Sequence, residues 1–212
     1  MPATGDDKRD SPWLDSPHAR VEAANPGLGA TTPALLQGII PHAPPPRPLL
    51  NTRSMLENMG SQKIMATQHG ARIDQATLKH VAEEAQHAYF MKRQAEKTAA
   101  RPLEFCAQDL LAPAAARMYF QRLEAALVRI LGHEHGPAAY LYMSLIVEFR
   151  ALWFYRLYQQ TLAHLGSAVS LKRLLGEEAN HLDDVAQRLD AAGERSDARV
   201  ETLLQHESTR YA

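Results

Sequence analysis

The sequence predicts an all-α protein. Only three of the 13 prolines lie beyond residue 48, and this part of the chain is rich in Ala, Leu, Gln, Glu and Arg, which are strong helix formers. It shows no convincing alternation of apolar and polar residues with a period of two, the pattern that is typical of a half-buried strand. We expect helices at residues 50–68, 72–97, 113–132, 137–164, 169–191 and 195–207.

Glycine and proline residues mark the ends of these helices. The breaks fall at Gly70, between Pro102 and Pro113, between Gly132 and Pro137, at Gly166 and at Gly193. A chain of 212 residues fits one domain with terminal extensions. We therefore predict a helical domain over residues 49–192, followed by a C-terminal helix or tail over residues 193–212.

The first 48 residues differ in composition from the rest of the chain. They hold ten of the 13 prolines, including the run HAPPPRP at 42–48. Because proline lacks a backbone N–H and disrupts helix interiors, we predict an extended or disordered proline-rich arm over residues 1–48. Such an arm would wrap either its own domain or the partner subunit of a homodimer, and the sequence does not choose between these.

Charge and cysteine content exclude several classes of protein. The net charge of −1 and the pI of about 6.8 give no electrostatic case for a nucleic-acid partner. The single cysteine, Cys106, excludes an intramolecular disulfide and a cysteine-based metal cluster. The sequence has neither an apolar signal segment at its start nor a run of 18 apolar residues. We therefore expect a cytoplasmic protein with no membrane partner.

Two short stretches of the chain are nearly the same. Residues 83–88 read EEAQHA and residues 177–182 read EEANHL, so that Glu-x-x-His occurs twice inside long helical patterns. Residues three apart lie on one face of a helix. The carboxylate and the imidazole of each stretch can therefore converge on one metal ion, provided that a neighbouring helix supplies another carboxylate.

The neighbouring helices each offer one such carboxylate. Glu57 is the only glutamate of the first helix, and it is level with Glu84 if the chain turns back at Gly70. Glu148 is the only carboxylate of the helix 137–164. A turn at Gly166 would offset it from the second Glu-x-x-His stretch by roughly 10 Å, and we retain it because no other acidic residue on that helix competes.

This set of residues resembles the ligand pattern of ferritin-like di-iron carboxylate proteins, which take one Glu from each of two helices and a Glu-x-x-His from each of two others. The resemblance covers residues 50–191. It implies a four-helix bundle with a long helical crossover, residues 98–136, between the second and third core helices. It also implies two iron ions, or manganese or a mixed pair, held by six catalytic and metal-binding residues: Glu57, Glu84, His87, Glu148, Glu178 and His181.

The activity that the resemblance implies is that of a non-haem di-iron oxygenase or oxidase. Such an enzyme activates dioxygen and oxidises a small-molecule substrate, with an electron-donor protein such as a ferredoxin or a flavin reductase as its partner. An iron-handling ferroxidase or a rubrerythrin-like peroxide scavenger is the first alternative. A metal-free helical interaction module is the second.

Several polar residues near these stretches have open roles. Glu83 and Glu177 precede the predicted ligands and should point about 100° away from them, toward solvent or a neighbouring helix. Asp184 is expected either to orient a ligand or to lie on the surface. His80, one turn before Glu84, is expected to support the site or lie at the surface, although some N-oxygenating relatives use an additional histidine. The HEH stretch at 133–135 predicts an exposed loop.

Overall fold

The computed structural model describes residues 17–39, 47–68, 73–132 and 137–208, and it contains no strand among them. The prediction of an all-α protein is confirmed. The eight helices of these residues are α1 (Pro17–Ala24), α2 (Leu28–Ile39), α3 (Arg47–Ala66), α4 (Gln75–Ala99), α5 (Pro113–Leu131), α6 (Pro137–His164), α7 (Lys172–Ala191) and α8 (Asp197–Ser208). The six helices predicted beyond residue 48 are all present, with ends shifted by at most three residues.

The prediction of an extended or disordered arm is wrong for residues 17–24 and 28–39, which form α1 and α2. The rest of the predicted arm up to residue 46 lies largely outside the described residues. Pro17 begins α1, where a missing N–H has no consequence for the helix. Val21 and Leu36 are buried, and both helices contact α6. Tertiary burial therefore outweighs the unfavourable proline content of this segment.

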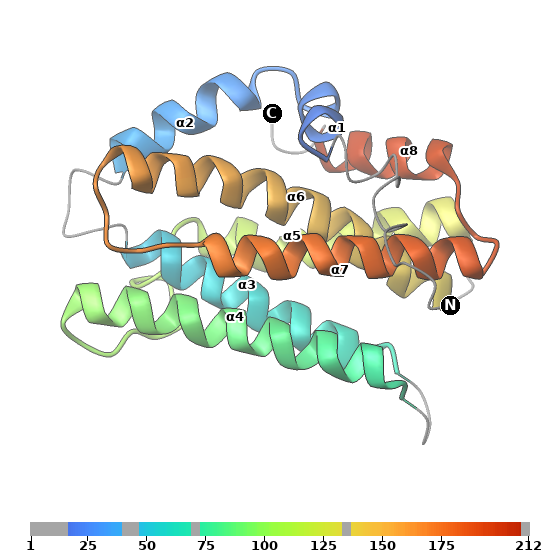
Figure 1. Cartoon of the computed structure of the whole chain (residues 1–212), viewed down its shortest axis with the longest axis horizontal. Coiled ribbons are helices and arrows are strands. Elements are labelled where there is room, and N and C mark those ends of the chain that lie inside the picture. The colour runs from blue at the N-terminus through green and yellow to red at the C-terminus, as the bar shows by residue number, and fades with distance from the viewer. Residues whose placement is uncertain (1–16, 40–46, 69–72, 133–136, 209–212) are drawn as a thin grey trace, which may run out of the picture.

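Helices α3 and α4 form a closely packed antiparallel pair (Figure 1). The Ser54 hydroxyl donates to the Ala88 carbonyl at 2.7 Å, and the Ser61 hydroxyl donates to the Val81 carbonyl at 3.1 Å. Small side chains on α3, together with Gly60, let the two backbones approach. This pairing fixes the register of α3 against α4.

Helix α6 lies at the centre of the molecule. It contacts α1, α2, α5, α7 and α8, and it is apolar on several sides, as expected for a helix surrounded by others. Its fully buried side chains include Tyr142, Leu145, Ile146, Phe149, Leu152, Tyr155 and Tyr158. Glu148 is the single carboxylate of this helix and is itself 2% exposed, so it needs a compensating partner.

The connection between α4 and α5 is tied to α3 by buried hydrogen bonds. The Asn51 side-chain amide donates to the carbonyls of Glu104 and Asp109 at 2.9 and 3.0 Å. The Arg101 guanidinium pairs with the Asp109 carboxylate at 2.5 Å. These contacts satisfy backbone groups in a segment that has no regular structure and hold α5 against α3 and α6.

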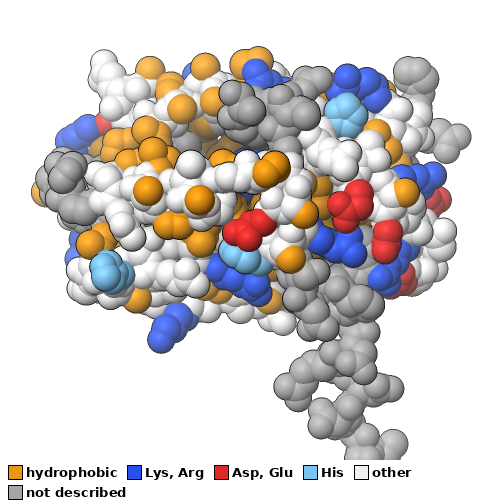
Figure 2. Space-filling view, turned by 90° about the horizontal axis from the view of Figure 1, so that it is seen from above, with side chains coloured by type: hydrophobic (Ala, Val, Ile, Leu, Met, Phe, Trp, Pro, Cys, Tyr) orange, Lys and Arg blue, Asp and Glu red, His pale blue; other side chains and the backbone are white. Residues whose placement is uncertain are grey.

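The upper face of the molecule is divided into an apolar and a charged half. Viewed from above, apolar side chains gather toward the end where α2 lies, and most acidic side chains lie toward the end of α1 and α8 (Figure 2). Leu35 of α2 is 61% exposed. Among the described residues, no helix combines the length and the apolar character needed to cross a membrane.

Candidate metal centre

The six residues predicted as ligands converge in one buried cluster. Glu57 comes from α3, Glu84 and His87 from α4, Glu148 from α6, and Glu178 and His181 from α7, and none is more than 5% exposed. Together with His80, these residues offer possible ligand atoms in two groups, each within 4.8 Å: His80, Glu84, Glu148 and His181 in one, and Glu57, Glu84, His87 and Glu178 in the other. Because Glu84 belongs to both groups, the cluster has room for two neighbouring cations.

The levels of the glutamates follow from where the helices begin and end. Glu57 lies nine residues before the end of α3, and Glu84 lies nine residues after the start of α4. This symmetry places the two carboxylates side by side, as the turn near Gly70 predicted, although residues 69–72 lie outside the described part of the chain.

Glu148 and Glu178 reach the same height along the bundle in a different way. Glu148 is about 24 Å from the end of α6, whereas Glu178 is only about 9 Å from the start of α7. The difference of roughly 15 Å is spanned by residues 165–171, which run back along α6 before α7 begins (Figure 1). The offset expected for a simple turn at Gly166 is therefore removed by the connection.

The two Glu-x-x-His glutamates lie between the two histidines. The Oε1 atom of Glu178 is 3.4 Å from Nδ1 of His87, and its Oε2 atom is 3.5 Å from Nδ1 of His181. The Oε1 atom of Glu84 is 3.7 Å from Nδ1 of His87 and 3.4 Å from Nδ1 of His181. Glu84 and Glu178 therefore each lie within 3.7 Å of both histidine Nδ1 atoms, a place from which a carboxylate could be shared by two cations.

These residues fit a pair of metal ions better than they fit a closed hydrogen-bond network. Five atoms of the cluster are buried without a hydrogen-bond partner among the described residues: Glu84 Oε1, His87 Nδ1, Glu148 Oε2, Glu178 Oε1 and His181 Nδ1. Metal bonds of about 2.1 Å hold neighbouring ligand atoms roughly 3.0–3.4 Å apart, close to the distances between these groups. Two divalent cations would also balance the charge of four buried carboxylates.

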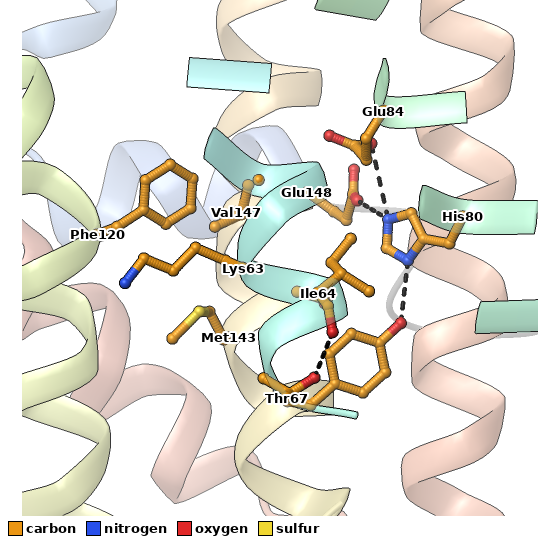
Figure 3. Close-up of a pocket in the computed structure, with 12 residues that line it drawn as sticks. Lys63, Ile64, Thr67, His80, Glu84, Phe120, Met143, Val147 and Glu148 are labelled. Atoms are coloured by element: carbon orange, nitrogen blue, oxygen red, sulfur yellow. Dashed lines mark hydrogen bonds and ion pairs between the residues drawn. The ribbon is translucent and has the colours of Figure 1, made fainter. Parts of the chain in front are cut away.

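His80 is not among the six ligands predicted from the sequence, but the structure brings its side chain into the same cluster. The His80 side chain is 5% exposed, and its Nε2 atom lies 3.1 Å from Glu148 Oε1 and 3.6 Å from Glu84 Oε1 (Figure 3). Its Nδ1 atom lies 3.1 Å from the Tyr140 hydroxyl. The signal in the sequence was its spacing, four residues before Glu84 and therefore on the same helix face. One of the two cation positions thus has two histidines.

The glutamate that precedes each predicted ligand supports the histidine of the other stretch. Nε2 of His87 lies 3.0 Å from Glu177 Oε2, and Nε2 of His181 lies 2.9 Å from Glu83 Oε2. Because a carboxylate only accepts, Nε2 of each ring carries the proton and Nδ1 is left to face the cluster. This crossed pairing explains why both stretches begin with two glutamates. Of the two alternatives for Glu83 and Glu177, solvent or a neighbouring helix, the structure shows contact with the neighbouring helix.

Glu57 is held by a cation and a phenol on its outer side. The Arg53 guanidinium donates to Glu57 Oε1 at 2.8 Å and to the Tyr155 hydroxyl at 2.6 Å, and that hydroxyl also donates to Glu57 Oε1. Burial raises the pKa of Glu57 to about 8, against the opposing effect of Arg53. The sequence alone does not predict this contact, because Tyr155 is far from Arg53 and Glu57 along the chain.

The protonation of the cluster shows how the protein compensates its buried carboxylates when no metal is bound. Burial opposes the charged form of the histidines, but contacts with neighbouring carboxylates, chiefly Glu148 at His80 and Glu178 at His87, outweigh it. They raise the pKa of His80 to about 11 and that of His87 to about 10. Burial also disfavours ionised Glu84 and Glu148, yet the neighbouring histidines lower the pKa of each to about 2. Protonated imidazoles therefore occupy the electrostatic role that metal cations can take.

A small cavity of about 30 Å³ adjoins the cluster. His80, Glu84 and Glu148 form one side of it, and Lys63, Met143 and Phe120 lie on the other (Figure 3). Its volume suits one or two water molecules or a diatomic molecule. The cluster therefore has space beside it for a ligand that the protein does not supply.

The remaining polar candidates lie away from the cluster. Asp184 is 50% exposed at its side chain and pairs with Arg188 at 3.7 Å, so the surface alternative describes it. The HEH stretch at 133–135 lies outside the described residues.

Comparison of the chain with protein-family models, with curated proteins and with solved structures finds no match.

Proposed function

We propose that the protein is a ferritin-like di-iron oxidoreductase that activates dioxygen to oxidise a small molecule. In this proposal α3, α4, α6 and α7 are the four core helices, and residues 100–136, with α5, are the crossover between the second and third. The observation that carries the proposal is the buried cluster of four carboxylates and three histidines, five of whose ligand atoms have no hydrogen-bond partner among the described residues.

The proposed ligands divide between two metal positions. His80, Glu148 and His181 would hold one ion, Glu57 and His87 would hold the other, and Glu84 and Glu178 would be shared. Bound ferrous ions would supply the electrons and the open coordination positions that reduction of dioxygen requires. Manganese, alone or with iron, uses the same ligand types. A ferredoxin or a flavin reductase would return electrons between turnovers.

The chain's own residues prepare the site in two ways. Glu83 and Glu177 fix the tautomer of the histidines, so that Nδ1 of both His87 and His181 is directed at the cluster. Arg53 and Tyr155 hold the outer oxygen of Glu57 and so orient its carboxylate. Burial of the proposed ligands excludes bulk water and strengthens each electrostatic contact that they make.

Iron handling is the alternative function. A protein that takes up ferrous ions would be expected to line the route to the cluster with carboxylates other than the ligands. Among the described residues that line the two cavities adjoining the cluster, however, the carboxylates are Glu57, Glu84 and Glu148, which are the proposed ligands themselves. This wall composition favours oxidation of an organic substrate over iron uptake.

Metal analysis tests the proposal directly. We expect about two iron or manganese ions per chain, and loss of both in the double variant His87→Ala/His181→Ala, since a histidine ligand is removed at each position. His164→Ala changes an exposed histidine of α6 and should bind metal as the unaltered protein does. Absence of bound metal after anaerobic loading of the unaltered protein with Fe(II) would refute the proposal.

Oxygen uptake separates the two functions. An oxygenase consumes dioxygen faster when an organic substrate is present, whereas a ferroxidase oxidises added ferrous ions without one. Mineralisation of many iron ions per chain in the absence of substrate would support iron handling instead.

A further inference from the structure

A second, larger cavity also reaches the cluster and adjoins the first one, with which it shares Gly60, Glu84, Phe120 and Val147 as wall residues. It has a volume of about 310 Å³, lies between α2, α3, α5 and α6, and touches Glu57 and Glu84 at its inner end. Leu35 and Leu111 also line it and are 61% and 40% exposed. The cavity therefore leads from an apolar rim at the surface to the carboxylates of the candidate metal centre, and its volume is within the range of small-molecule sites.

Most of the cavity wall is apolar. Its side chains include Leu49, Leu56, Phe120, Val147, Ala151 and Phe154. Apart from Glu57 and Glu84, the described residues of the wall include no carboxylate, and two arginines, Arg53 and Arg150, contribute to it. Such a wall favours an apolar molecule. The two guanidinium groups oppose an ammonium group wherever it lies away from Glu57 and Glu84.

The cavity wall includes Trp153, which is 3% exposed. Its indole Nε1 is buried without a hydrogen-bond acceptor among the described residues. A buried donor that is left unpaired is unfavourable, so a ligand that brings an acceptor would satisfy it. Trp153 lines the same cavity as Glu57 and Glu84, so a ligand held at the indole can extend to the cluster.

We propose that this cavity binds the substrate of the metal centre, and that the substrate is an apolar molecule with one hydrogen-bond-accepting head group, neutral or anionic. The head group is received by the Trp153 indole, and the apolar body extends toward Glu57 and Glu84. The assignment as a substrate site rests on the proposed function, whereas binding to the cavity does not require the metal.

Trp153 provides a direct readout of binding. The chain has two tryptophans, so Trp13→Phe leaves Trp153 as the single indole. We expect decanol and decanoate to change its fluorescence in a saturable way, with and without iron, and decylamine to bind at least tenfold more weakly. Absence of saturable binding of both decanol and decanoate, or equal binding of decylamine, would overturn the proposal.

Matched substitutions on α5 test the location. Ala115 is exposed and lines the cavity, whereas Ala114 is exposed and outside its wall. By calorimetry, Ala115→Trp should weaken decanoate binding at least tenfold and Ala114→Trp should leave it unchanged. Equal affinities of the two variants would refute binding in this cavity. Trp153→Phe, which keeps an aromatic ring and removes the N–H, should weaken binding about threefold to tenfold, and unchanged binding would refute the role of the indole.

Metal analysis of the same samples keeps the two proposals apart. Decanoate binding in a protein that takes up no metal would refute the proposed function and leave the cavity assignment as a binding site. Two metal ions per chain without decanoate or decanol binding would refute the cavity assignment alone.

Discussion

Glu177 accepts a hydrogen bond from Nε2 of His87 at 3.0 Å. Removal of its carboxylate should weaken binding of the metal ion that we propose for His87. The carboxylate fixes the ring tautomer and makes Nδ1 more basic. Loss of such a partner typically lowers metal affinity 10- to 100-fold, which corresponds to about 1.4–2.7 kcal/mol. We expect Glu177→Ala to show a loss in this range for one of the two ions.

Anaerobic titration with Co(II) against a competing chelator measures this effect, because the two ions give separate binding steps when their affinities differ. Glu83→Ala should weaken the other step, since Glu83 lies 2.9 Å from Nε2 of His181. Asp184→Asn is the control, because Asp184 is exposed and pairs with Arg188. Glu177 also pairs with Arg173 at 2.8 Å, so Arg173→Ala separates loss of that pair from loss of the histidine contact.

The proposed effect of these hydrogen bonds is refuted if Glu177→Ala and Glu83→Ala both bind two Co(II) ions with affinities within twofold of those of the unaltered protein. It is also refuted if Asp184→Asn weakens Co(II) binding as strongly as these two substitutions do. In the first case the histidines are oriented by their packing alone. In the second the effect is a general loss of negative charge rather than loss of a hydrogen bond.

Three further predictions concern the same cluster. Metal loading at pH 7 should release protons, because the pKa values of His80 and His87, about 11 and 10, keep both rings protonated until metal displaces the protons. Affinity should therefore rise at least tenfold per pH unit between about pH 6 and 8, and an indicator dye in weak buffer that detects no protons would contradict this. Arg53→Met should raise the pKa of Glu57 further and lower the affinity for one of the two Co(II) ions at least tenfold in a titration at pH 7. Arg156→Met, at an exposed position, should leave both affinities unchanged. Gly60→Ala should raise the melting temperature by about 1–4 °C through helix propensity. Its Cβ would lie 3.4 Å from Glu84 Oε2, where the two cavities adjoin, so substrate-dependent oxygen uptake should fall. A calorimetric scan that shows no gain in stability would contradict the argument from helix propensity, and unchanged oxygen uptake would contradict the effect of the close approach.

The sequence predicted the helices beyond residue 48 and six residues of the cluster because both depend on local rules. Helix formers, glycine and proline set the ends of α3 to α8 within a few residues. The three-residue spacing of Glu84 and His87, and of Glu178 and His181, places each pair on one helix face whatever surrounds it. Glu57 and Glu148 could be selected because each is the single glutamate of its helix.

The contacts of the cluster depended on how distant segments meet. The proline content of residues 1–48 gave no indication that Val21 and Leu36 would be buried among other helices. The level of Glu148 depends on the path of residues 165–171, and the roles of Glu83 and Glu177 depend on the antiparallel register of α4 and α7. Whether His80 lies inside the cluster or at the surface was likewise open until α6 placed Glu148 beside it. The sequence by itself determined which side chains share a helix face, because helical periodicity is local. Only the tertiary structure decided which faces meet and at what level, because these follow from packing between residues that are far apart in the chain.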